Sequence, residues 1–508
     1  MTRLVTALSV AVALTAGSVS ASSSAAGAAS VPSPEPTVVT EPAVASFGVQ
    51  RLDWNSCGRR LRCAGVRVPL DYAQPDGKTI RIAIARPAGP LRKRVMLFNP
   101  GGPGGTGLDI RGFLAFFSPA MLKRFTPIGF DPRGVAGSGD LVCYTNRQLQ
   151  RFGKNPPRTR SGQEDLFAFA ARINRSCQRR YPTWLPNLGT PDVARDLDVI
   201  RQALRQPRLH YLGVSYGTYL GATYAAAFPD NVGRMILDSG LSPLVDMRGW
   251  LRAQARATQQ VFRVFARDCV SAGPAVCPWP GDTDEVIDGF TRLLRQLDRR
   301  PIQPPGFPEP VTAMALASST QSLLAQGPTG ESMLLLYLQA LHPPQTQARA
   351  RSADGRALAR KVRRVTQVPA NLQTVNQAVN CSDRPTPNDP RTARADARRW
   401  GRFAPSFGRY FAWRPITCAS WPVRNGGPVL PRPRSTTRRP VLLIGGTHDP
   451  LTPIQWTFQL ARGFARSRVV TWTGVGHGAL GFGSECLQRT VSRYARSGRL
   501  PHAGRVCN

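Results

Sequence analysis

A serine between two glycines is the feature that most restricts how this chain can fold. Gly213-Val214-Ser215-Tyr216-Gly217 stands between a continuous apolar run, LHYLGV at 209–214, and a helical pattern that extends from about residue 216 to 228. A serine in this context lies on a sharp turn from strand to helix, which lifts its hydroxyl clear of the sheet, and the flanking glycines make the strained turn sterically feasible. The sequence therefore predicts a buried strand that leads directly into a helix at Ser215.

Short apolar runs recur on both sides of this turn, with helical stretches between them. They are VMLFNP (95–100), TPIGFD (126–131), RMILDS (234–239), PVLLIGG (440–446) and RVVTWTG (468–474). Continuous runs of this kind are typical of parallel strands that helices bury on both faces. Two earlier segments, 66–72 and 79–87, alternate apolar and polar residues around a Gln-Pro-Asp-Gly turn, which predicts an antiparallel opening. The fold class is therefore α/β, with a mostly parallel, doubly wound sheet.

About 190 residues from Leu241 onward do not continue the alternation of strands and helices. They contain helical pieces, a Pro-rich segment at 301–310 and Arg-rich stretches. A chain of this length exceeds the roughly 250 to 300 residues at which single cores usually stop growing. We therefore expect a core in two parts, 51–245 and 436–508, with a large, mainly helical cap insertion at 246–435.

Ser215 needs a base and a carboxylate that orients the base, because a serine hydroxyl is a poor nucleophile at neutral pH. His477 lies in a glycine-rich loop just past the last predicted strand, and Asp449 follows the penultimate strand. The chain order Ser, Asp, His is the order that this kind of serine turn uses. His448 is the competing base, but it directly precedes Asp449. The sequence predicts Ser215, Asp449 and His477 as a catalytic triad.

Donors for the oxyanion of a tetrahedral intermediate are expected at two places. The backbone N–H of Tyr216, next to the serine, is the first. The glycine-rich segment NPGGPGG at 99–105 follows an early strand and supplies the second, with Gly102 preferred and Gly101 next. A phosphate-binding interpretation of this segment is weaker, because no Gly-Lys-Ser/Thr follows it.

The first thirty residues have the layout of a secretory signal peptide, with one Arg, an apolar stretch at 4–16 and then small residues. The apolar stretch is shorter than the ~20 residues needed to span a bilayer. Residues 31–50, rich in Pro and small residues, predict an extended linker. We expect a protein secreted from the cell, in solution or associated with the cell wall.

Ten cysteines in an exported chain predict disulfides. No CxxC pair indicates zinc or thioredoxin chemistry, and we expect neither a metal nor another cofactor. The sequence leaves the connectivity open, but sequential neighbours are the simplest pairing. These pairs are Cys57 with Cys63, Cys143 with Cys177, Cys269 with Cys277, Cys381 with Cys418, and Cys486 with Cys507.

The formal net charge of +37 comes almost entirely from arginine, since lysine occurs at only five positions. No nucleic-acid-reading motif accompanies the charge, so sequence-specific nucleic-acid binding is not expected. The functional alternative is a weak association with anionic cell-wall polymer or a membrane surface, for which such a charge provides long-range attraction. We expect a monomer.

Five segments together resemble secreted actinobacterial tripeptidyl aminopeptidases and their proline-iminopeptidase relatives, the S33-type α/β-hydrolases. They are NPGGPGG, GFDPRGVAGSG (129–139), GVSYGTYLGATYAAAFPDNVGRMILDS, GGTHDPLTP and GVGHG. The resemblance implies the α/β-hydrolase fold, the same triad and oxyanion donors, and a cap that shapes the substrate site. It also makes Asp383, in Asn380-Cys381-Ser382-Asp383, a candidate partner for the free amine of a substrate, with a structural Asp beside a disulfide as the alternative. Asp238-Ser239 departs from the usual Asp-Gly of these proteins.

The leading functional expectation is an aminopeptidase that releases short N-terminal peptides or residues through an acyl-enzyme on Ser215. An esterase or amidase that acts on small esters or lactones with the same triad is the second. A non-catalytic surface-binding protein of the same fold is the third, because a fold by itself does not determine function. The sequence does not identify the substrate within these classes.

Overall fold

The apolar runs of the sequence form a mixed sheet. The computed structural model describes residues 42–508 except 59, 280, 305, 308, 342–352, 367, 385–388 and 424–432. In this part of the chain, ten strands follow the order β1-β2-β3-β5-β4-β6-β7-β8-β9-β10. Their bounds are β1 Asn55–Ser56, β2 Leu61–Pro69, β3 Thr79–Pro87, β4 Val95–Asn99, β5 Thr126–Phe130, β6 Leu209–Val214, β7 Val232–Asp238, β8 Val441–His448, β9 Ser467–Val475 and β10 Val506–Cys507. Every run that the sequence predicts as a strand overlaps one of these elements.

The direction of the strands explains where a site can form. β1, β2, β3 and β5 pair antiparallel in that order, whereas the pairs from β5 through β4, β6, β7, β8 and β9 to β10 are parallel. This confirms the antiparallel opening and the mostly parallel sheet. Because the carboxyl ends of parallel strands meet at one edge of a sheet, the segments that follow β4, β6, β7, β8 and β9 come together there.

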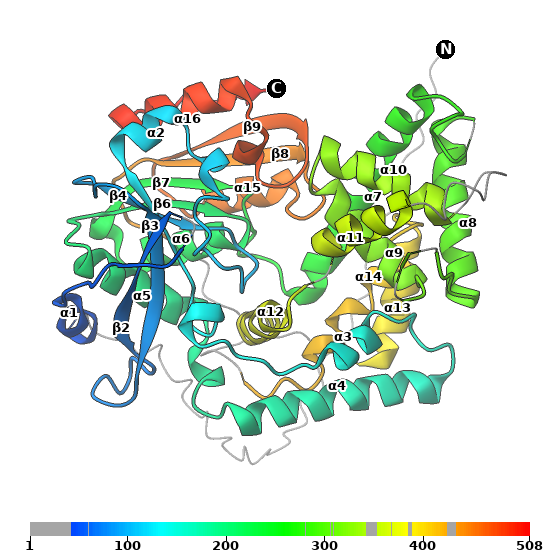
Figure 1. The fold of residues 1–508 in the computed structure, drawn as a ribbon, viewed down its shortest axis with the longest axis horizontal. Coiled ribbons are helices and arrows are strands. Elements are labelled where there is room, and N and C mark those ends of the chain that lie inside the picture. The colour runs from blue at the N-terminus through cyan, green and yellow to red at the C-terminus, as the bar shows by residue number, and fades with distance from the viewer. Residues whose placement is uncertain are drawn as a thin grey trace, which may run out of the picture. The chain divides into compact units, whose positions relative to one another are not determined.

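Helices cover both faces of the sheet (Figure 1). Apolar residues of α5 (Thr190–Ala203), α6 (Tyr216–Ala227) and α15 (Ile454–Ala461) pack with strand residues in one cluster. Apolar residues of α2 (Pro119–Arg124) and α16 (Glu485–Ser497) pack on the other face in a second cluster. β4 is buried along its whole length, as expected for a strand between two helical layers.

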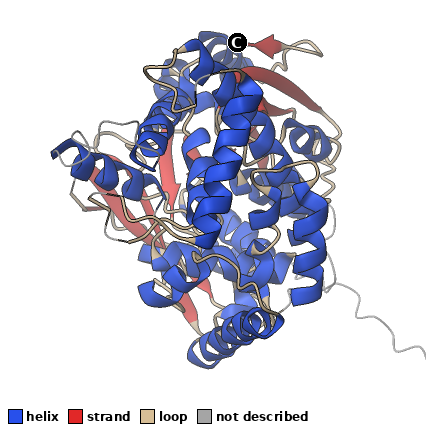
Figure 2. Cartoon of the chain, turned by 90° about the vertical axis from the view of Figure 1, so that its right-hand side faces the viewer, coloured by secondary structure: helices blue, strands red, loops and turns tan. Residues whose placement is uncertain are grey.

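Between β7 and β8 the chain is helical and has an apolar cluster of its own. This helical block (residues 247–418) lies to the right of the sheet in Figure 1, and Figure 2 shows its helices in front of the strands. Its elements are α7 Met247–Ser271, α8 Thr283–Arg299, α9 Ala313–Leu324, α10 Pro328–Leu341, α11 Ala353–Thr366, α12 Ala370–Asp383, α13 Pro390–Gly401, α14 Gly408–Phe411 and the 3-10 turn η6 Arg414–Cys418. The position of the block agrees with the expected cap, whose boundaries stay a prediction.

One helix from the N-terminal half joins this block. The apolar side of α4 (Arg160–Arg180), with Phe167 and Ala170, belongs to the same apolar cluster as α7 and α8. From the sequence this segment is expected in the core (51–245), because an amphipathic stripe does not indicate whether the sheet or the helical block packs against it. Only the tertiary packing shows that the apolar cluster of the block includes residues that precede Ser215 in the sequence as well as residues that follow it.

The predicted linker also differs in part from the structure. Residues Pro42–Gly48 form α1, which packs against α5. The ring of Phe47 contacts the apolar cluster of the sheet, so this end of the linker has an apolar side chain to bury. The predicted signal peptide and residues 31–41 lie outside the described residues. None of the described helices is both long and apolar enough to cross a bilayer.

All ten cysteines form disulfides, and each bond joins the sequential pair that the sequence favours. The bonds are Cys57–Cys63, Cys143–Cys177, Cys269–Cys277, Cys381–Cys418 and Cys486–Cys507. Cys381–Cys418 connects the end of α12 to the end of η6, and Cys486–Cys507 connects α16 to β10. Four of the five bonds span 6 to 34 residues and the fifth spans 37, so each stabilises a local loop or a chain end.

Candidate active site

Ser215 lies on the sharp turn between β6 and α6. Its backbone has φ 59° and ψ −125°, a conformation that a non-glycine residue keeps only where its surroundings hold it. Its N–H donates to the carbonyl of Asp238 at 3.0 Å. A Cβ on Gly213 would lie 2.3 Å from the carbonyl oxygen of Gly217, and a Cβ on Gly217 would lie 2.7 Å from the carbonyl oxygen of Asn99. Both glycines of the motif are therefore required by close backbone contacts.

His477 and Asp449 form a buried hydrogen-bonded pair at the same edge of the sheet. Nδ1 of His477 lies 2.9 Å from Oδ2 and 3.1 Å from Oδ1 of Asp449. The hydroxyl of Thr452 donates to Oδ2 of Asp449 at 2.7 Å and lies 3.2 Å from Nδ1 of His477. Burial disfavours the charged imidazole, but the adjacent carboxylate outweighs it, and the pKa of His477 is raised above its ordinary value. The pair has the geometry of a base that a carboxylate orients.

His448, the competing base, and His210, in the strand before Ser215, have other partners. Nδ1 of His448 lies 2.9 Å from the hydroxyl of Thr447 and 3.2 Å from the carbonyl of Thr473. His210 accepts a hydrogen bond from the backbone N–H of Arg234 at 2.8 Å, and burial together with nearby arginines lowers its pKa to about 4. His210 is thus a neutral packed residue within a strand, and Asp449 bonds to His477 rather than to its neighbour His448.

The glycine-rich segment after β4 lies against the serine turn. A Cβ on Gly101 would lie 2.8 Å from Cβ of Ser215 and 3.1 Å from the backbone nitrogen of Tyr216. The N–H of Gly101 donates to Oδ1 of Asn99 at 3.0 Å, which removes it as an oxyanion donor. Within the described residues, the N–H groups of Gly102 and Tyr216 have no protein acceptor. These two amides are thus the available donors beside Ser215.

Comparison with known proteins shows the family of this chain. The model of the alpha/beta hydrolase fold matches residues 94–277, and that of the TAP-like proteins matches residues 404–507. A tripeptidyl aminopeptidase of Streptomyces lividans is 30% identical over 90% of this chain and 86% of its own length. The chain belongs to the TAP-like α/β-hydrolases. This confirms the family resemblance and the predicted α/β-hydrolase fold.

Two further relatives of this TAP-like hydrolase carry different names. A protein named serine protease Hip1 from Mycobacterium tuberculosis is 30% identical over 88% of this chain and 87% of its own length. A protein named carboxylesterase B from the same species is 31% identical over 89% of both chains. The family therefore includes proteins named for peptide cleavage and for ester cleavage at similar distances from this chain.

The loop that carries His477 is held by the last residue of β7 and by the residue after it. In this TAP-like hydrolase the carboxylate of Asp238 accepts the backbone N–H groups of Ala479 at 3.1 Å and Leu480 at 2.9 Å. The hydroxyl of Ser239 accepts the N–H of Gly478 at 2.9 Å. Burial raises the pKa of Asp238 to about 7, although the two N–H donors and the nearby histidine act in the opposite direction.

The helical block also contacts this loop. The backbone N–H of His477 donates to the carbonyl of Ala325, at the end of α9, at 2.9 Å. A Cβ on Gly327 would lie 2.8 Å from the carbonyl oxygen of Val475. His477 of the TAP-like hydrolase is therefore positioned from two sides, by the sheet edge and by the block.

Asp383, the candidate partner for a substrate amine, lies at the end of α12 and is 2% exposed. Its carboxylate accepts the hydroxyl of Thr190 at 2.5 Å, and that hydroxyl lies 2.6 Å from the phenol oxygen of Tyr216. Asp383 does not line the cavity that contains Ser215. The structure thus favours the alternative of a structural Asp, which connects α12 to the start of α5.

A cavity of about 920 Å³ between the sheet edge and the helical block contains Ser215 and Gly102. Its wall comes from α3 (Asn146–Phe152), α7, α9, α12, η6 and the loop after β8. The wall is mainly apolar, and its polar groups include Thr452, in the loop that carries Asp449. No group of three or more His, Cys, Asp and Glu side chains suited to a metal ion occurs among the described residues.

Three residues of the site escape sequence reasoning. Thr452 supports Asp449 from three positions further on, and Asp238 and Ser239 hold the histidine loop from a different strand. The charged residue at the end of the apolar run RMILDS and the departure of Asp238-Ser239 from the family's Asp-Gly point to this position, but neither signal indicates its role. Their roles depend on which segments meet at the sheet edge, and a single sequence does not state this.

Proposed function

We propose that this protein is a secreted serine peptidase that transfers the acyl part of a peptide to Ser215. The observation that carries the proposal is the buried His477–Asp449 pair, which belongs to the same sheet edge as a serine on a strained turn. Peptides are the proposed substrates because relatives at about 30% identity are named tripeptidyl aminopeptidase and serine protease. Export is supported by five disulfides and by the leader-like first thirty residues.

Each step of the proposed reaction has a residue to perform it. Nδ1 of His477 is engaged by Asp449, which leaves Nε2 to take the proton of Ser215 as its oxygen attacks the scissile carbonyl. The N–H groups of Gly102 and Tyr216 then stabilise the oxyanion. His477 returns the proton to the leaving amine, and water hydrolyses the acyl-enzyme by the same steps in reverse order. The raised pKa of His477 predicts that activity decreases on the acidic side as the ring becomes protonated.

A fluorophosphonate label and matched substrates test this function. Wild type should take up the label, and the Ser215→Ala variant should not. Free-amine tripeptide amides, single-residue amides, N-acetylated amides and p-nitrophenyl esters would then be compared by kcat/KM. Preference for free-amine tripeptides supports aminopeptidase action, whereas equal cleavage of blocked peptides argues against it. Labelling that survives the Ser215 substitution would refute the triad.

An esterase is the second candidate, because one relative at 31% identity is named a carboxylesterase. Both reactions use the same acyl-enzyme, and they differ in the leaving group that must be protonated. Turnover of small esters without any turnover of amides would favour this candidate. A protein that takes up no label and turns over no substrate would favour the non-catalytic alternative.

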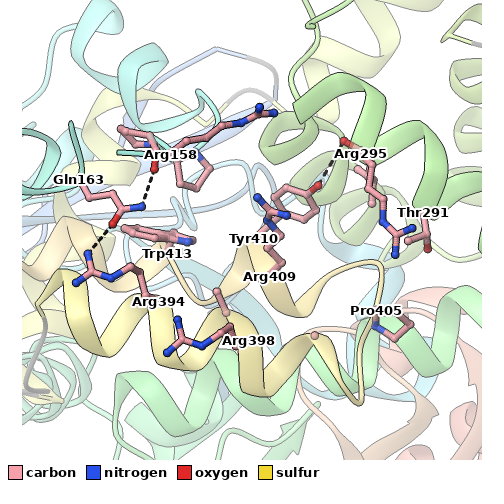
Figure 3. A pocket seen from close by; sticks show the side chains of 15 residues that line it. Arg158, Gln163, Thr291, Arg295, Arg394, Arg398, Pro405, Arg409, Tyr410 and Trp413 are labelled. Carbon is pink, nitrogen blue, oxygen red and sulfur yellow. Dashed lines mark hydrogen bonds between the residues drawn. The ribbon is translucent and has the colours of Figure 1, made fainter. Parts of the chain in front are cut away.

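We also propose that arginines of the helical block, together with Arg158 just before α4, give a weak association with anionic cell-wall polymer. Arg158, Arg295, Arg394, Arg398 and Arg409 line a pocket of about 460 Å³ that has Tyr410 and Trp413 in its wall (Figure 3). Arg158 and Arg409 share one carboxylate, that of Asp298, at 3.7 and 3.1 Å. Arg394 donates to the neutral amide of Gln163 at 2.6 Å, and Arg295 and Arg398 form no ion pair with the described residues. The excess of positive charge favours a ligand with several negative charges.

Binding to a phosphate-rich polymer over a range of salt concentrations tests this association. The double variant Arg394→Gln/Arg398→Gln should bind several-fold more weakly at low salt and show a smaller salt dependence. The control is Arg493→Gln/Arg496→Gln, which removes the same charge from an exposed side of α16. Equal weakening by both double variants would mean that net charge alone, and not the pocket, causes the association.

A further inference from the structure

Arg414 is a cation in the wall of the catalytic cavity that the proposed reaction does not use. It begins η6 and lines the cavity that contains Ser215. Its Nη1 donates to Oε1 of Gln321 at 2.6 Å, and its Nη2 donates to the hydroxyl of Ser318 at 3.1 Å. Its Cζ lies 3.5 Å from the centre of the Phe411 ring, so the guanidinium is stacked as well as hydrogen-bonded. The group is held in one orientation.

The partner of Arg414 connects it to the catalytic acid. Nε2 of Gln321 donates to the carbonyl of Pro450 at 3.1 Å, the residue next to Asp449. Since a carbonyl only accepts, this bond fixes Oε1 of Gln321 as the end that faces Arg414. The guanidinium is thus two hydrogen bonds away from the loop that carries the catalytic carboxylate.

Arg133, a fully buried arginine, shows what the partly buried Arg414 lacks. The guanidinium of Arg133 donates five hydrogen bonds, two of them to the carboxylate of Asp196 and three to backbone carbonyls of Pro69, Leu70 and Asn187. All five of its N–H groups are used, and the carboxylate balances its charge. Arg414 donates to two neutral side chains and has no carboxylate partner among the described residues. Burial alone lowers its pKa to about 9, so the charge persists at neutral pH.

The rest of the cavity wall does not supply the missing anion. Among the described residues that line it, Glu309 is the only acid, and its side chain is exposed. Lys154 and Arg363 add two further cations. An excess of positive charge in a cavity wall favours an anionic ligand and disfavours a cationic one.

We propose that Arg414 binds a carboxylate that the substrate carries near its scissile bond. The inference rests on the proposed function, because it assigns a preference to the same cavity. The N–H groups of Arg414 that have no protein partner form charge-assisted hydrogen bonds to this carboxylate. An Asp or Glu side chain in the acyl part and the free C-terminal carboxylate of a short leaving peptide present the same chemistry to Arg414.

Isosteric substrate pairs test the preference and distinguish its two sources. For the acyl part, fluorogenic tripeptide amides would carry Glu or Gln at each position in turn. For the leaving part, short peptides would carry a free C-terminal carboxylate or a C-terminal amide. In one of these pairs, wild type should favour the carboxylate by about tenfold or more in kcat/KM, mainly through KM. Arg414→Gln should reduce the ratio to near one, and Arg414→Lys should keep part of it.

Lys154→Gln is the matched control, because it removes one positive charge from the same cavity wall and should keep the preference. Wild type that shows no preference in any pair would overturn the proposal, as would a preference that Arg414→Gln leaves unchanged. If Arg414→Gln does not fold, the wild-type ratios and the Arg414→Lys variant decide.

A binding measurement separates this proposal from the proposed function. Glutarate, but not glutaramide at the same ionic strength, should raise the unfolding temperature of wild type and not that of Arg414→Gln. If glutarate stabilises in this manner while no peptide is cleaved, the peptidase function fails and the carboxylate subsite stands. If glutarate and glutaramide act alike and no pair shows a preference, the subsite is refuted.

Discussion

Replacement of Asp238 by Asn tests how the sheet edge positions the histidine loop. The substitution keeps the shape of the side chain but removes its charge and its titration. The remaining oxygen still accepts the backbone N–H of residue 479 or 480. The new NH2 group faces the other backbone N–H and, as a donor, cannot accept it. The carboxylate is completely buried, and its pKa is raised from 3.8 to about 7.

The raised pKa gives the size and sign of the expected effect. The folded state binds the proton of Asp238 more tightly than the unfolded chain does, so this group favours folding at low pH. Its contribution to the free energy of unfolding is complete below about pH 4. This contribution is lost as the pH rises to about 7, where the carboxyl of the folded protein ionises. Each pH unit in this window lowers the free energy of unfolding by about 1.4 kcal/mol. The free energy of unfolding of wild type should therefore fall by about 4 kcal/mol relative to Asp238→Asn between pH 4 and 7.

Urea unfolding followed by tryptophan fluorescence at several pH values measures this difference. The comparison of wild type with Asp238→Asn cancels the titration of groups that do not interact with Asp238, whereas His477 and Asp449 do interact with it. Asp76→Asn, at an exposed turn, is the control and should leave the pH profile unchanged. A difference between wild type and Asp238→Asn that stays constant from pH 4 to 7 would refute the reasoning. It would mean that Asp238 is not held as a buried, proton-binding carboxyl.

Three further substitutions have definite expected outcomes. Thr452→Val removes the hydroxyl that donates to the carboxylate of Asp449, and kcat should fall about tenfold with little change in KM in steady-state assays. Ser239 has φ 58°, so Ser239→Gly should be more stable than Ser239→Ala by about 1 kcal/mol in thermal unfolding, and equal stability would argue against backbone strain. Cys381→Ser/Cys418→Ser opens a loop of 37 residues and should cost about 4 kcal/mol in urea unfolding; an unchanged midpoint would show that the bond does not stabilise the protein.

The α/β architecture could be predicted because its signals are local. Apolar runs such as LHYLGV and PVLLIGG are continuous when helices cover both faces of a strand, and Gly213 is required by a contact within the serine turn, with the carbonyl of Gly217. Asp449 and His477 follow strands directly, so the parallel direction of the strands brings them to one edge. These conclusions need only the order of elements along the chain.

The remaining features depend on which segments meet in space. Three features depend on contacts between residues that are far apart in sequence. These are the packing of α4 in the helical block, the hydrogen bonds from the histidine loop to Asp238, and the hydrogen bond of Arg414 to the neutral Gln321. Asp383 shows the same limit, because its motif is visible in the sequence while its contact with Thr190 is not.

The serine turn and the chain order of the proposed triad were determined by the sequence, because strand and helix periodicity and the backbone conformation of a turn are short-range. The partners of buried charges were decided by the tertiary structure alone. A buried carboxylate or guanidinium takes its proton affinity and its role from the groups packed around it, and those groups come from every part of the chain.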